Sequence, residues 1–243
     1  MELAEKNQRE AWEVIRKTDI MNIWKSVGAE INLVGSLNMG LLVKNRDVDF
    51  HIYSSPLTPA GSFMAMAKLA ENPFVKRITY NNLLDTEEAC IEWHAWYEDP
   101  ENGAWKMDMI HILKHSRYDG YFEKMAERIK AVLTEETRKA ILRLKYETPD
   151  TEYCMGVEYY QAVLRDGVRT YAEFENWRRQ RSGDRYCGMD ALILSVFLFI
   201  ELISRFSRAD QAFPSFRLSC FIRQVITFHC SRTYVPERDS PKR

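Results

Sequence analysis

Residues 47–52 read Asp-Val-Asp-Phe-His-Ile, a strict alternation of polar and apolar side chains that is typical of a half-buried β-strand. Successive side chains of a strand point to opposite faces, so Asp47, Asp49 and His51 share one surface while the apolar residues face the core. Two carboxylates held side by side repel each other and attract a divalent cation. This face is a predicted metal site, in which His51 is more simply a neighbour of the ligands, or an exposed histidine, than a ligand itself.

A Gly-Ser pair precedes this strand, and its Gly35 lies twelve positions before Asp47. Residues 31–34 read as a buried strand that runs directly into the pair, so the chain is expected to turn at the glycine. Glycine lets the backbone approach a ligand closely, and the amides freed at such a turn can donate to phosphate oxygens together with the Ser36 hydroxyl. A Gly-Ser pair alone is usually an ordinary turn; the spacing to the paired acids is what indicates phosphate binding.

A third acidic residue, Asp108, stands alone within the strand-like stretch 105–113. It shares a strand face with isoleucines, and a carboxylate on a largely apolar face needs a metal ion or another partner. An edge-strand aspartate that faces water is the less favoured alternative. Asp99 and Glu101 are weaker candidates, because residues 98–103 look like the hairpin turn before that strand.

These residues resemble the pattern of the nucleotidyltransferase superfamily that includes DNA polymerase beta, and in particular its minimal and antibiotic-modifying members. The family pattern is a Gly-Ser turn, a further glycine, Asp-x-Asp on the next strand and a third carboxylate on a later strand. The matching positions lie within residues 20–115 and are Gly35, Ser36, Gly40, Asp47, Asp49 and, in type and strand setting, Asp108.

By this resemblance, Asp47, Asp49 and Asp108 are the catalytic residues and the metal ligands, with Mg²⁺ as cofactor and Mn²⁺ as a substitute. The two paired acids would bridge two ions, and Asp108 would bind the ion that activates an acceptor hydroxyl, or take its proton. The implied reaction moves a nucleoside monophosphate from a triphosphate such as ATP to that hydroxyl and releases pyrophosphate. The expected contacts of the triphosphate are Gly35, Ser36, Gly40 and Lys44.

Two positions depart from the family pattern. Met39 stands between the two glycines where many members carry an arginine, and Arg46 stands before the first aspartate where they carry a small polar residue. The triphosphate charge must then be met elsewhere, and the nearest basic residues are Lys44, Arg46 and Lys106, each of which is more simply a solvated charge at a strand end. Because of these departures, a second function stays open: the chain could be a nucleotide-binding or regulatory module that has the fold but does not catalyse the reaction.

Composition argues against a long nucleic-acid partner. Lys plus Arg (34) nearly balance Asp plus Glu (35), so the 243 residues carry no broad basic field. A small molecule, a nucleotide or a protein is therefore the expected acceptor, rather than DNA. Residues 1–6 lack the apolar core of a signal peptide and the five cysteines form no CxxC pair, which predicts a cytoplasmic protein with reduced thiols and no membrane contact.

The order of expected elements is α+β with a mixed sheet. Helical spacing covers residues 2–26 and 59–71, and strands are expected at 31–34, 47–52, 75–79, 89–97 and 105–113. These make up a predicted nucleotidyltransferase-like catalytic domain, residues 1–116. A helical domain, residues 117–186, follows with helices at about 118–146, 152–165 and 170–181. Residues 187–243 read as a buried apolar helix and an arginine-rich tail to which no function is assigned.

In the resembling family, such a helical domain often covers the active-site cleft and helps to recognise the acceptor. The residues to examine are Tyr153, Tyr159, Tyr160, Trp177, Arg178 and Arg179, although helix packing explains the aromatic ones equally well. A protein-interaction role also stays open, for example as one half of a toxin–antitoxin pair, with the helical half as the contact surface.

Overall fold

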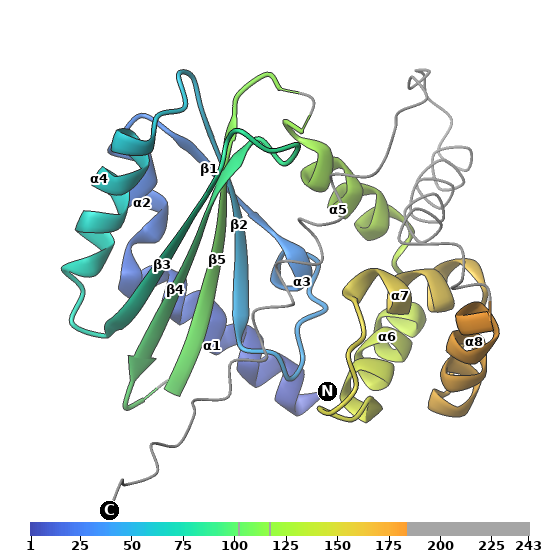
Figure 1. Ribbon diagram of the computed structural model, residues 1–243. Helices are drawn as coiled ribbons and strands as arrows, with labels where there is room; N and C mark the ends of the chain where they lie inside the picture. Colours follow the sequence, from blue (N-terminus) through green and yellow to red (C-terminus); the bar gives the residue numbers. More distant parts are fainter. Residues whose placement is uncertain (102, 117, 184–243) are drawn as a thin grey trace, which may run out of the picture.

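The structure is a computed structural model that describes residues 1–101, 103–116 and 118–183 (Figure 1). The apolar helix and arginine-rich tail expected over residues 187–243 lie outside the described residues. Within the described part of the chain, no helix has the length and apolar character needed to cross a bilayer.

A five-stranded sheet forms the centre of the first half, in the order β1-β2-β5-β4-β3. Strands β2 and β5 are parallel and the other neighbours are antiparallel, so the sheet is mixed and the expected α+β class is confirmed. The strands are β1 (Glu30–Val34), β2 (Asp47–Ser54), β3 (Val75–Leu83), β4 (Cys90–Asp99) and β5 (Gly103–Leu113).

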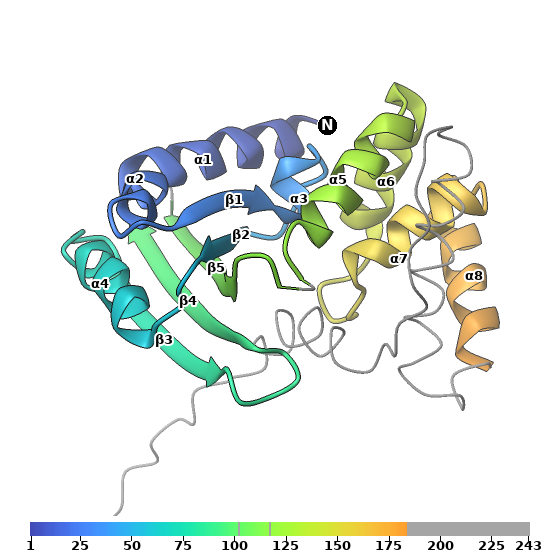
Figure 2. The ribbon, with the colours of Figure 1, turned by 90° about the horizontal axis from the view of Figure 1, so that it is seen from above.

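Three helices cover one face of this sheet, as Figure 2 shows from above. They are α1 (Glu2–Thr18), α2 (Ile20–Lys25) and α4 (Pro59–Ala70), all at the expected places. The alternation in β2 is confirmed, because Val48, Phe50 and Ile52 are fully buried in the core beneath these helices. The polar residues of β2 therefore lie on the opposite face of the sheet.

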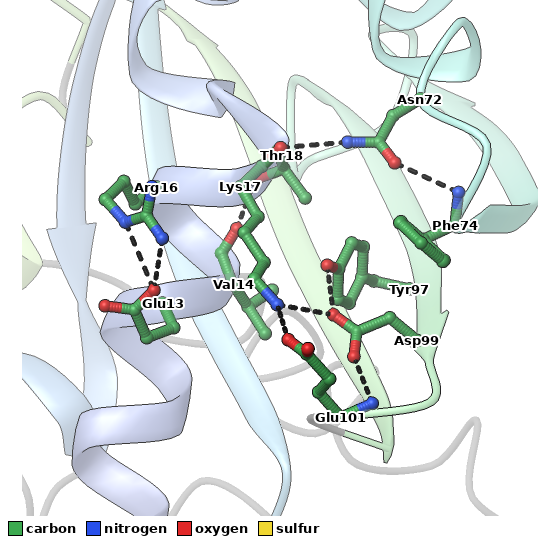
Figure 3. A network of polar contacts seen from close by, with 10 residues as sticks. All are labelled: Glu13, Val14, Arg16, Lys17, Thr18, Asn72, Phe74, Tyr97, Asp99 and Glu101. Atoms are coloured by element: carbon green, nitrogen blue, oxygen red, sulfur yellow. Dashed lines mark hydrogen bonds and ion pairs between the residues drawn. The ribbon is translucent and has the colours of Figure 1, made fainter.

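The turn between β4 and β5 is tighter than expected, since Asp99 pairs directly with Gly103. Figure 3 shows the hydrogen-bond partners of the two acidic residues at this turn. The Lys17 ammonium of α1 donates to Asp99 (3.2 Å) and to Glu101 (2.9 Å). The Tyr97 hydroxyl also donates to Asp99. These contacts fasten the hairpin to α1. Asp99 and Glu101 thus have structural partners on the helix-covered side.

The second half of the described chain is helical. Its elements are α5 (Tyr121–Val132), α6 (Glu135–Glu147), α7 (Gly156–Tyr160), a π-helical segment (Gln161–Arg165) and α8 (Tyr171–Gly183). The helical stretch expected at about 118–146 is formed by two helices, α5 and α6, which are separated at Leu133 and Thr134. The Thr134 hydroxyl there accepts a hydrogen bond from the Thr137 amide (3.2 Å) and caps a new helix.

A second apolar core lies among these helices and takes in residues that precede β2. Leu41 is fully buried in it, and Met39 and Val43 are nearly so, together with Ile141 and Phe174 from the helices. The Met39 that departs from the family pattern is thus a packing residue. The predicted boundary between two domains after residue 116 stays a prediction. This core contains residues from both before and after that boundary.

Candidate functional site

The register of the sheet places the predicted acids side by side on the face that α1, α2 and α4 leave uncovered. Asp49 of β2 lies directly opposite Asp108 of β5, and Asp47 lies opposite Lys106. Opposed residues of neighbouring strands, about 4.8 Å apart, project their side chains to the same face. The structure therefore brings together three carboxylates from two strands that are distant in sequence.

Asp49 lies at the centre of this group, and its surroundings disfavour the ionised form of its carboxyl group. Burial raises its pKa well above the ordinary value, and the neighbouring carboxylates of Asp47 and Asp108 raise it further. The ammonium groups of Lys106 and Lys145 act in the opposite direction. A cation between the acids would offset the repulsion that raises the pKa of Asp49.

Asp108 is almost fully buried, at 1% exposure, and it is held by two basic partners. Its Oδ1 accepts from the Lys106 ammonium at 2.9 Å and lies 2.6 Å from Nδ1 of His94, which is itself buried. His94 comes from the opposing position of β4. The expectation of a solvated Lys106 is therefore replaced by a side chain bound to a candidate catalytic acid.

Gly35 lies against the Asp49 carboxylate at the start of the short helix α3 (Gly35–Asn38), where the sequence suggests a simple turn. Its φ of +69° is in the region that favours glycine, and an added Cβ would lie 2.0 Å from Oδ2 of Asp49. The glycine thus gives the carboxylate the space it occupies. Gly40 also has a positive φ, of +68°, but its neighbours are the side chains of Arg138 and Gln8.

Ser36 is joined to the helical half of the chain by Lys145, a residue of α6 that sequence reasoning missed. The Lys145 ammonium donates to Oγ of Ser36 at 2.8 Å and to the Leu41 carbonyl at 2.9 Å, and it lies 3.4 Å from the Tyr160 hydroxyl. Tyr160 is 3.3 Å from the same Oγ. An ammonium group and two hydroxyl groups therefore converge beside the acids.

The basic residues expected near the phosphates have other partners. Lys44 donates to the Thr148 carbonyl (2.5 Å) and pairs with Asp150 (2.6 Å). Arg46 forms an ion pair with Glu10 of α1 and lies over the Trp105 ring. The role of Lys44 as a triphosphate contact stays a prediction, and Lys145 is better placed beside Ser36.

His51 is buried on the site face below the acids. Its ring lies edge-on to Phe122 and its Nδ1 is 3.3 Å from the Tyr53 hydroxyl. Burial lowers its pKa to about 3, so the ring is neutral at physiological pH. These contacts place His51 among packing residues beside the acids.

The aromatic residues of the helical half are mostly packed on one another. Tyr159 stacks on Phe174, which in turn stacks on Trp177, and Arg178 forms an ion pair with Glu152. Arg179 pairs with Glu175, and Tyr153 is half exposed. Of the six residues singled out in the helical half, Tyr160 reaches the site through Ser36 and Lys145, and the Lys145 ammonium also lies 6.0 Å from the centroid of the Tyr159 ring.

The donor set suits a hard divalent cation, because three carboxylates supply oxygen ligands. As the side chains stand, no three His, Cys, Asp or Glu groups among the described residues are arranged to hold a metal ion. The three carboxylates fit such an ion if Asp108 exchanges its Lys106 partner for the metal.

Comparison with known proteins gives matches to solved structures alone. No protein-family model matches the chain, and no curated protein sequence matches it. The chain is similar to the Cid1 poly(U) polymerase with MgGTP bound (14% identity, TM-score 0.48, covering 65% of this chain and 50% of that one). It is also similar to a cytoplasmic RNA terminal U-transferase (15%, TM-score 0.46, covering 65% and 48%).

A further structure of Cid1, with Mg 3′-dATP bound, matches at 15% identity and a TM-score of 0.47, with 64% of this chain and 49% of that one covered. The chain therefore spans about half the length of the solved proteins that it matches. The activities in these descriptions are those of the matched proteins.

Proposed function

We propose that the chain is a metal-dependent nucleotidyltransferase that moves a nucleoside monophosphate from a triphosphate to a hydroxyl acceptor and releases pyrophosphate. The observation that carries this proposal is the register of Asp49 against Asp108, with Gly35 fitted beneath the Asp49 carboxylate. Acids that face a glycine-led turn, a serine and a lysine combine metal ligands with phosphate donors at one place.

In this proposal Asp47, Asp49 and Asp108 hold Mg²⁺, with Mn²⁺ as a substitute. When bound, the metal supplies charge neutralisation of the triphosphate and a lower pKa for the attacking hydroxyl. Lys145 and Ser36 donate hydrogen bonds to phosphate oxygens. Asp108 takes the proton of the acceptor once Lys106 has left its Oδ1.

The acceptor and the location of the protein stay predictions. A hydroxyl group of a small molecule or of a protein is what the balanced composition suggests, and the nucleoside triphosphate is the donor. A cytoplasmic location, where Mg²⁺ and ATP are abundant, belongs to the same proposal.

Calorimetric titration of the protein with each nucleoside triphosphate, with and without Mg²⁺, tests this. We expect metal-dependent binding that Asp49→Asn abolishes and that Asp85→Asn, a change at an exposed aspartate, leaves intact. Pyrophosphate release on addition of an acceptor from cell extract establishes turnover. Equal heats with and without metal, or equal binding by both variants, contradicts the proposal.

A nucleotide-binding module without turnover is the second candidate, favoured by the two basic partners that occupy Asp108. It predicts the same metal-dependent binding. Binding without pyrophosphate release in the presence of every extract fraction would support this candidate over the enzyme.

A further inference from the structure

Strand β3 is an open edge of the sheet. It spans nine residues, and among the residues that the structure describes β4 is the one strand that pairs with it. The opposite edge, β1, has five residues and is contacted by α5, where Asn32 donates to Glu123 at 3.4 Å. The outer amides and carbonyls of β3 therefore form a row without a strand partner in the described chain. Such a row pairs readily with another strand.

The helix beside this edge, α4, has two apolar faces. One face packs on the sheet and is buried. The other face is exposed, and its residues repeat at positions i, i+3, i+4 and i+7; they are Ala60, Phe63, Met64 and Ala67. This spacing puts them on one side of the helix, and such a stripe normally faces a core. We call these four residues the α4 stripe; within it, Phe63 is 47% exposed and Met64 is 55% exposed.

The α4 stripe and β3 form one surface. The Phe63 ring lies 4.6 Å from the ring of Tyr80 in β3, measured between centroids. Tyr80 and Ile78 both pack against the core beneath the helices, so they project to the helix-covered face. Figures 1 and 2 show α4 beside β3 at the same margin of the sheet. A strand that pairs with β3 would therefore bring its own covering elements against the α4 stripe.

We propose that this surface binds a second copy of the chain, with the two β3 strands antiparallel about a two-fold axis at Thr79. An axis perpendicular to the sheet through Thr79 sets residues that lie equally far before and after it opposite each other. The opposed pairs are then Thr79–Thr79, Ile78–Tyr80, Arg77–Asn81, Lys76–Asn82 and Val75–Leu83.

The side chains of these pairs are complementary. Apolar residues meet apolar residues, and each cation meets an asparagine, whose amide oxygen accepts hydrogen bonds. An axis at Ile78 would instead place Val75 opposite Asn81. An axis at Tyr80 would place Ile78 opposite Asn82. The edge is thus self-complementary at one register, which favours a second copy over an unrelated strand.

The pairing joins the two five-stranded sheets into one continuous sheet and brings the α4 stripes of the two copies towards each other. It is regular around Thr79 and ends near Val75, where a bulge shifts the register of β3 against β4. The acids of the candidate site lie on β2 and β5, which β4 separates from the joint. The inference therefore does not depend on the proposed function.

Sedimentation equilibrium of the full chain over a series of concentrations measures the dimer directly. We expect a mass that rises to twice the 28.6 kDa of the chain. Met64→Glu should raise the dissociation constant by about tenfold or more, because the two-fold axis brings two carboxylates to the joint and removes them from water. Leu3→Glu, at an exposed apolar residue of α1, is the matched control and should leave the constant unchanged. A monomer at every concentration, or equal constants in the two variants, overturns the inference.

Thr79→Cys tests the register. At the two-fold axis the introduced thiols lie opposite each other, with Cα atoms about 5 Å apart, which is within the range of a disulfide. Mild oxidation with diamide should therefore link two chains, detected as a doubled mass on a non-reducing gel. In Asn82→Cys the two thiols would be about 20 Å apart, so this exposed position is the control. Failure of Thr79→Cys to cross-link, or equal cross-linking in Asn82→Cys, overturns the inference.

Discussion

Gly35 and Asp49 occupy complementary space, since a Cβ on the glycine would lie 2.0 Å from Oδ2 and 3.0 Å from Cβ of the aspartate. The contact joins the turn after β1 to the paired strand β2, where Val34 lies opposite Asp49. The position of the central carboxylate thus depends on the absence of a side chain one residue beyond β1.

Gly35→Ala should therefore displace the Asp49 carboxylate and abolish metal-dependent triphosphate binding, measured by calorimetry. Gly28→Ala is a matched control, because Gly28 also has a positive φ (+81°) but nothing lies within 4 Å of its added Cβ. Both variants should lose about 1 kcal/mol through backbone strain. If Gly28→Ala loses triphosphate binding to the same degree, the contact with Asp49 is not the cause.

Asp49→Asn should raise the melting temperature in the presence of EDTA, because burial and the carboxylates of Asp47 and Asp108, which raise the pKa of Asp49, disfavour an ionised form that asparagine does not have. Each kcal/mol gained corresponds to about 2–4 °C for a chain of this size. Added Mg²⁺ should stabilise the wild type and leave the variant unchanged. An equal response of the two proteins to Mg²⁺ in thermal unfolding would argue against a metal at this position.

Lys145→Met should weaken triphosphate binding by about tenfold to a hundredfold, since one charge-assisted hydrogen bond contributes roughly 1.5–3 kcal/mol. Lys139→Met is the control on the same helix, as Lys139 is exposed and pairs with Glu135. Affinity is measured by calorimetry with Mg²⁺ present. Unchanged affinity in Lys145→Met would leave Ser36 without its proposed partner in phosphate binding.

Stability should fall as the pH falls from 6.5 towards 4, because burial lowers the pKa of His111 to about 4. The unfolded chain, with an ordinary histidine pKa near 6.5, then binds a proton that the folded chain excludes. The neutral ring lies between the hydroxyls of Ser54 (2.7 Å) and Ser62 (3.1 Å). A shift of this size corresponds to about 3 kcal/mol at most.

Urea unfolding at a series of pH values checks this. His111→Gln should reduce the slope between pH 6.5 and 4, even if it lowers stability at neutral pH, while the contribution of His51, whose pKa burial lowers to about 3, remains. His115→Gln, at an exposed histidine, should leave the curve as in the wild type. A slope that persists unchanged in His111→Gln would assign the effect to other groups.

The sequence predicted much of the sheet and its polar face, because alternation in β2 is a local property. The pairing of His94 with Asp108 could also be predicted from the sequence. With Asp99 opposite Gly103 at the hairpin, counting back along both strands puts His94 opposite Asp108. The predicted strands 89–97 and 105–113 give the same pairing, because their end residues Tyr97 and Trp105 lie opposite each other.

The parallel register of Asp49 and Asp108 could not be read from the sequence in the same way. No tight turn joins β2 to β5, so nothing local fixes which residues face each other. Lys145 is 109 positions from Ser36 and reaches it through helix packing. The sequence gives one local indication of Lys145. It follows the fully buried Ile141 by four residues, so its side chain lies on the same apolar face of α6.

The bond between Ser36 and Lys145 has a consequence for biosynthesis. A ribosome delivers the serine, the glycine turn and the first two acids long before it delivers the lysine of α6. A nascent chain that has completed the sheet still lacks this ammonium group, so under the proposed function nucleotide affinity would arise late in translation, when the helices after residue 120 have docked.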